Sequence, residues 1–85
     1  MKTIYKYPIE ITNKQIIEMP CNYKLLHVGL DPEGNPVLWA EVYTSSPTAL
    51  VPIYVIGTGH PVPEETKHIG SFVQIPFVWH VYTNI

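Results

Sequence analysis

One short stretch combines residue types that suit the binding of an anionic or polar ligand: Gly57, Thr58, Gly59 and His60. Because glycine has no Cβ, backbone N–H groups can approach a phosphate or carboxylate closely. The threonine hydroxyl and the histidine imidazole add hydrogen bonds, and histidine titrates near neutral pH. Prolines follow directly and exclude the helix start that nucleotide-binding glycine loops require. Two interpretations remain: a backbone nest for an anion, or a tight turn that needs a positive φ.

A ligand of this kind needs further groups from elsewhere in the chain. Trp39, Trp79 or Tyr54 could stack on a base, although such aromatic side chains belong more often to a core or an interface. Lys6 or Lys67 could pair with its negative charge. The predicted ligand site therefore consists of Gly57, Thr58, Gly59, His60, Trp39, Trp79, Tyr54, Lys6 and Lys67.

The sequence contains no pattern that indicates catalysis, a metal ion or a cofactor. The spacing of the four histidines matches no ligand signature, and no cysteine pair supports them. Glu64 and Glu65 are adjacent and would point apart on an extended chain. Ser45, Ser46 and Ser71 lie outside any nucleophile-elbow context. We expect a protein that is not an enzyme, with no catalytic residues, no metal site and no cofactor.

Composition limits the possible partners. The 85 residues are 46% hydrophobic and 14% charged, against about 25% charged in average proteins. So few charges on a small protein predict that a second subunit covers some apolar surface, so we expect a homo-oligomer. The formal net charge is −2 and the basic residues are all lysines, scattered along the chain, which argues against duplex nucleic acid as a partner.

The same sequence argues against a membrane or secreted protein. Its apolar runs are far shorter than the roughly 18 residues that suggest a membrane span, and its start lacks a signal-peptide pattern. The single cysteine, Cys21, cannot form an internal disulfide framework. The expected location is the cytoplasm.

The elements that would position these residues are short strands. Nine prolines leave no room for a long helix, and the segments between them alternate apolar and polar residues or are continuously apolar. Strands are expected over residues 2–11, 15–19, 23–30, 36–43, 50–56, 68–75 and 77–83. Residues 50–56 are nearly all apolar, which is typical of a central strand covered on both faces.

The clearest hairpin joins the third and fourth of these strands. Asp31, Pro32, Gly34 and Asn35 lie between them, and these residue types preset φ or tolerate a positive φ. The pattern as a whole predicts an all-β fold: one domain over residues 1–85, a small sandwich or barrel of about seven short, mostly antiparallel strands.

The order of several short motifs resembles a family of small proteins of unknown function found mainly in phage and prophage genomes. These motifs are IYKYP near the start, LWA in the middle, GTGHP at the glycine stretch and VWH near the end. The resemblance implies a short, phage-borne accessory domain. Relatives carry arginines before the glycine motif; here Lys6, Lys14, Lys24 and Lys67 would have to supply the positive charge.

Two functional hypotheses follow. The first is a non-enzymatic phage protein in the host cytoplasm that sequesters a nucleotide-derived host immune signal, of the cyclic nucleotide or ADP-ribose type, as an anti-defence sponge. Such a protein needs a pocket and no catalytic residues. The alternative is a protein–protein interaction module that binds a host or virion protein through an aromatic patch or an unpaired sheet edge.

Overall fold

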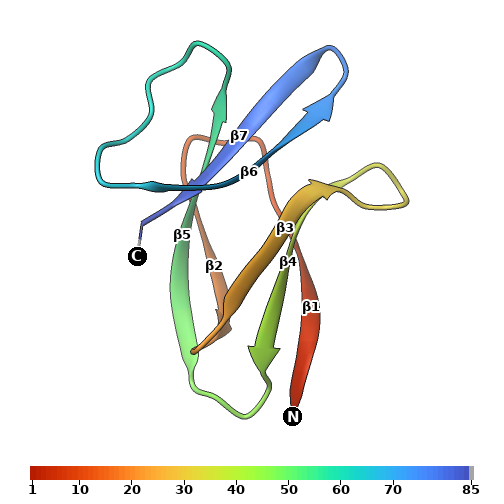
Figure 1. Cartoon of the computed structure of the whole chain (residues 1–85), viewed down its shortest axis with the longest axis vertical. Helices are drawn as coiled ribbons and strands as arrows, with labels where there is room; N and C mark the ends of the chain where they lie inside the picture. Colours follow the sequence, from red (N-terminus) through yellow and green to blue (C-terminus); the bar gives the residue numbers. More distant parts are fainter. Residues whose placement is uncertain (85) are drawn as a thin grey trace.

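The chain folds into two antiparallel β-sheets that pack on each other, in a computed structural model that describes residues 1–84 (Figure 1). The strands are β1 (Lys2–Pro8), β2 (Gln15–Pro20), β3 (Lys24–Leu30), β4 (Pro36–Tyr43), β5 (Thr48–Gly57), β6 (Lys67–Gln74) and β7 (Phe77–Thr83). One sheet has the order β1-β4-β3 and the other β2-β5-β7-β6. The all-β prediction is confirmed. Residues 1–84 contain no helix that could cross a membrane.

The core lies between the two sheets. Leu38, Ala40 and Val42 of β4 are fully buried, and so are Ile53 of β5 and Val81 of β7 in the facing sheet. These residues alternate with more exposed ones along each strand, as expected where one face packs and the other meets solvent.

Two expectations about the strands are wrong in detail. β1 ends at Pro8, because Ile9 leaves the ladder, donates its N–H to the carbonyl of Pro36 and enters the core. β5 is central in its sheet, between β2 and β7, but it is covered on one face only. Leu50 on the other face is 66% exposed. The apolar run in β5 therefore provides one buried face and one apolar face that this chain leaves uncovered.

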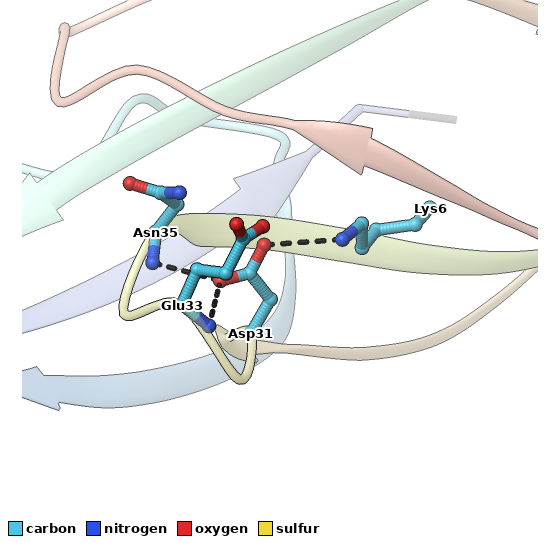
Figure 2. Close-up of polar contacts among 4 residues, drawn as sticks. All are labelled: Lys6, Asp31, Glu33 and Asn35. Atoms are coloured by element: carbon cyan, nitrogen blue, oxygen red, sulfur yellow. Dashed lines mark hydrogen bonds and ion pairs between the residues drawn. The ribbon is translucent and has the colours of Figure 1, made fainter.

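The hairpin between β3 and β4 forms around Asp31, as the turn residues predict. The Asp31 carboxylate accepts hydrogen bonds from the backbone N–H groups of Glu33, at 3.0 Å, and Asn35, at 2.9 Å (Figure 2). Its other oxygen accepts from Lys6 Nζ of β1 at 3.1 Å. The Asn35 N–H, together with Lys6 and the Glu33 N–H, holds the pKa of Asp31 below its ordinary value of 3.8 against the opposing effect of burial.

The two sheets approach each other closely where β3 packs against β6. Gly70 of β6 faces Val28 of β3, and a Cβ on Gly70 would lie only 2.9 Å from Val28 Cγ2. Both strands contain an irregularity near this contact: the β3–β4 register shifts between Leu25 and His27, and the β6–β7 register shifts between His68 and Gly70. Residues at the start of β3 and at the start of β6 line one hollow.

Candidate functional site

The glycine stretch forms a tight turn at the end of β5. The N–H of His60 donates to the carbonyl of Gly57 at 3.1 Å, and Gly59 has a φ of +89°. A positive φ at the third residue of a four-residue turn is typical of type II turns and explains the glycine there. Because the His60 N–H is used inside the turn, it is not available to a bound phosphate. The Thr58 hydroxyl forms a 2.7 Å hydrogen bond with His80 Nε2 of β7.

A hollow of about 520 Å³, which we call the glycine-turn hollow, lies beside this turn. Its wall includes Gly57, Thr58 and His60 from the turn and Trp79 from β7. Trp79 is half-buried, and its Nε1 donates to Gln74 Oε1 at 3.2 Å. The lining is completed by Ile11, Thr12, Asn13, Val55, Pro76, Phe77 and Val78, so residues 1–84 contribute no lysine and no carboxylate to it. This hollow suits an aromatic or apolar group better than an anion.

The other residues of the predicted ligand site lie elsewhere. Tyr54 is on the outer face of the four-stranded sheet, where Lys14 Nζ lies 5.9 Å from its ring centroid. Trp39 is on the outer face of the other sheet and stacks on His27 at 5.7 Å. Lys6 is paired with Asp31. The structure therefore brings Gly57, Thr58, His60 and Trp79 together at one hollow, leaves Gly59 in the turn, and separates the rest within one chain.

Lys67 lines a different hollow, of about 580 Å³, between the starts of β3 and β6. Lys24 of β3 lines the same hollow, with Tyr23 and His68. Asn22, Leu25, Ile69 and Thr83 complete the lining, to which residues 1–84 contribute no aspartate or glutamate. We call it the lysine hollow.

The ion pairs that residues 1–84 form do not include the two lysines of this hollow. Within residues 1–84, the structure contains two ion pairs: Lys2 with Glu41 at 3.0 Å and Lys6 with Asp31 at 3.1 Å. Lys24 lies opposite Glu41 in the β3–β4 ladder, but the Glu41 carboxylate is bonded to Lys2. Lys24 and Lys67 are therefore two lysines without an ion-pair partner among residues 1–84, and both line one hollow of a chain whose net charge is −2.

The family model described as "Domain of unknown function (DUF7352)" matches residues 1–85, the whole chain. The chain belongs to this family. Neither the curated proteins nor the solved structures give a significant match. The DUF7352 description assigns no activity, so the geometry of the two hollows is the basis for a functional proposal.

In this DUF7352 chain, sequence reasoning found Lys67 and considered Lys24 as a source of charge, but it missed Asn22, Tyr23 and His68. The sequence offers one weak signal, since each of the two lysines stands close to the start of a predicted strand, Lys24 before Leu25 and Lys67 before His68. That signal does not show that the starts of β3 and β6, which belong to different sheets, line the same hollow.

Proposed function

We propose that the chain is a non-enzymatic binding protein that sequesters a small, nucleotide-derived anion in the lysine hollow. The observation that carries the proposal is the pair Lys24 and Lys67, which line one hollow to which residues 1–84 contribute no aspartate or glutamate. The resemblance to phage-borne proteins favours a host immune signal, of the cyclic nucleotide or ADP-ribose type, as the ligand. The protein would then act as an anti-defence sponge in the host cytoplasm.

The chemistry of the hollow supports a ligand with both a phosphate and a ring. Two ammonium groups attract a phosphate from solution and can donate several hydrogen bonds to it. The half-buried ring of Tyr23 offers an apolar surface for a base, and stacking of this kind contributes about 1–3 kcal/mol per base. The volume of about 580 Å³ is within the ordinary range of small-molecule sites, about 300–1,000 Å³.

The test is a calorimetric titration of the purified protein with cyclic dinucleotides and with ADP-ribose derivatives. We expect saturable binding that weakens as salt is raised, because part of the attraction is between charges. Substitution of Lys24→Ala or Lys67→Ala should each weaken binding about five- to tenfold, equivalent to about 1–1.4 kcal/mol.

The matched control is Lys14→Ala, which removes the same charge from outside the lysine hollow, beside Tyr54. It should leave the affinity within about twofold. The ligand should be recovered chemically intact after the complex is denatured, since sequestration involves no reaction. Absence of binding across the ligand set, or an equal loss in all three lysine variants, would contradict the proposal.

The expected homo-oligomer remains part of this proposal. Leu50 and Ile16 are exposed on the outer face of the four-stranded sheet, at 66% and 51%. A second copy that covers this face would bury apolar surface that a single chain leaves in water. A native mass of one chain at micromolar concentration would refute this part without affecting the ligand proposal.

A specific observation favours the interaction module as a second candidate. The tip of the β6–β7 hairpin exposes large apolar side chains, with Ile75 90% and Phe77 56% exposed. Such residues are typical anchors at protein interfaces. Under this candidate, Ile75→Asp combined with Phe77→Asp should abolish capture of a stoichiometric host or virion protein. Capture that persists in the double variant would argue against the tip as the interface.

A further inference from the structure

Four polar side chains form a hydrogen-bonded row across the outer face of the four-stranded sheet. His68 Nε2 lies 2.9 Å from Ser71 Oγ, and Ser71 Oγ lies 2.7 Å from His80 Nδ1. On its other side, His80 Nε2 lies 2.7 Å from Thr58 Oγ1. Both ring nitrogens of His80 are thus held, and one serine oxygen is shared by two imidazoles.

The bulge in β6 is what places the two histidines together. In a regular strand, residues three apart point to opposite faces of the sheet. The register shift between His68 and Gly70 adds one residue, so that His68 pairs with Tyr82 and Ser71 pairs with His80, both on the outer face. The His68 ring packs against the Tyr82 ring at a centroid distance of 5.2 Å, which fixes its direction.

We infer that His68 and His80 form a binding site for a late first-row divalent metal ion such as Zn²⁺, Cu²⁺ or Ni²⁺. The ligating atoms are His68 Nε2 and His80 Nδ1. Both contact the same oxygen, so they lie no further apart than those two hydrogen bonds laid end to end. A metal ion needs bonds of about 2.0–2.1 Å to each imidazole nitrogen, so a small movement of the two rings suffices once Ser71 rotates aside. Neutral imidazole is a preferred ligand for these ions.

Thr58 completes the arrangement that metal-binding histidines need. Coordination through His80 Nδ1 requires the proton to be on Nε2, and the Thr58 oxygen at 2.7 Å can accept that N–H. A hydrogen bond to the ring nitrogen that does not bind the metal fixes the tautomer and the orientation of the ring. The Thr58 hydroxyl can in turn donate to the carbonyl of Val78, at 3.5 Å.

The site offers two imidazoles and leaves other positions open. Residues 1–84 contain no group of three or more His, Cys, Asp or Glu side chains placed to hold a metal ion. Solvent would therefore complete the coordination. Such a site binds an ion reversibly and exchanges it with the medium. It shares His68 with the lining of the lysine hollow, but it needs no anion there.

The experiment is a calorimetric titration with Zn²⁺, together with electron paramagnetic resonance of the Cu²⁺ complex. We expect one ion per chain and a spectrum that shows two coordinated imidazole nitrogens. His68→Ala and His80→Ala should each weaken Zn²⁺ binding at least about tenfold. Ser71→Ala should keep the binding, because it removes the competing hydroxyl and leaves both ligands.

The matched control is His27→Ala, which removes an imidazole from the outer face of the other sheet, where it stacks on Trp39. It should not change the affinity, and circular dichroism should confirm that each variant is folded. Wild-type binding that is not saturable would overturn the inference. So would a His68→Ala or His80→Ala variant that binds like the wild type.

Discussion

Gly70 permits the close approach of the two sheets, and Gly70→Ala should disturb both stability and the lysine hollow. An added Cβ would lie 2.9 Å from Val28 Cγ2, whereas nonbonded carbons prefer about 3.5–4.0 Å. Val28 is 1% exposed and its branched side chain is stiff at χ1, so it cannot swing out into solvent as a long surface side chain could. We expect the strain to be relieved by moving β6 away from β3, which would also disturb the lysine hollow.

The expected magnitude follows from two opposing contributions. Crowding by an extra methyl in a packed core costs about 1–3 kcal/mol. Replacing glycine also reduces the conformational entropy of the unfolded chain, which stabilises the folded protein by about 0.4–1 kcal/mol. The net destabilisation should be about 1–2 kcal/mol, of a total stability of roughly 4–13 kcal/mol for a chain of this length. The melting temperature should fall by about 4–16 °C.

The assay is thermal and urea unfolding of Gly70→Ala beside Gly29→Ala as the matched control. A Cβ on Gly29 would meet the end of the exposed His27 imidazole at 3.2 Å, and that side chain can swing away. The control should change stability by less than about 0.5 kcal/mol. The double variant Gly70→Ala with Val28→Ala should be destabilised by at least about 1 kcal/mol less than the sum of the two single variants, because the colliding methyl is gone.

Two results would refute this reasoning. The first is a Gly70→Ala variant as stable as the wild type, which would mean that β6 and β3 have room between them. The second is strict additivity of the destabilisations caused by Gly70→Ala and Val28→Ala, which would show that the destabilisation does not arise at the contact between these two residues. If the lysine hollow binds an anion as proposed, Gly70→Ala should also weaken that binding a few-fold.

Three further substitutions test other parts of the fold. Asp31→Asn should make the free energy of unfolding depend less steeply on pH in acid. The folded pKa of Asp31 is lowered, so its stabilising contribution is present above the ordinary value of 3.8 and is lost as pH falls through the folded pKa. Equal steepness in wild type and variant below about pH 4 would count against this. Thr83→Val should lower the free energy of unfolding, measured in urea, by about 1–2 kcal/mol. The buried Thr83 Oγ1 donates a hydrogen bond to the Pro52 carbonyl at 2.7 Å, and valine cannot. No loss would show that this carbonyl is satisfied otherwise. Leu38→Ala should cost about 2–5 kcal/mol by the same measurement, since Leu38 is fully buried, and a cost below 1 kcal/mol would contradict its place in the core.

The parts of the fold that local chemistry determines could be predicted from the sequence. The 31–35 turn depends on an aspartate that bonds backbone N–H groups two and four residues later, so its signal lies within five residues. Alternation in residues 36–43 puts Leu38, Ala40 and Val42 on one face of the strand, and in the structure that face of β4 is the buried one. The prolines likewise bounded most strands near their observed ends.

The parts that depend on contacts between distant segments could not be predicted. The close packing of β3 and β6, which belong to different sheets, requires a glycine opposite a valine that is 42 positions away in the numbering, and no local pattern marks that pair. The bulge in β6 moves His68 to the same face as Ser71, against the strict alternation that sequence reasoning assumes. Both the lysine hollow and the histidine pair result from these two irregularities.

The distribution of positive charge is what separates the two hollows as candidate anion sites. The glycine motif has the residue types of a phosphate loop, but its turn uses the His60 N–H internally, and its hollow contains no lysine. Of the five lysines, Lys2 and Lys6 are neutralised by carboxylates and Lys14 lies beside Tyr54, which leaves Lys24 and Lys67. Those two line one hollow. In a protein with a net charge of −2, an anion must overcome overall repulsion, so it should bind where uncompensated positive charge is concentrated. The glycine turn is better explained by the geometry of the chain than by a ligand.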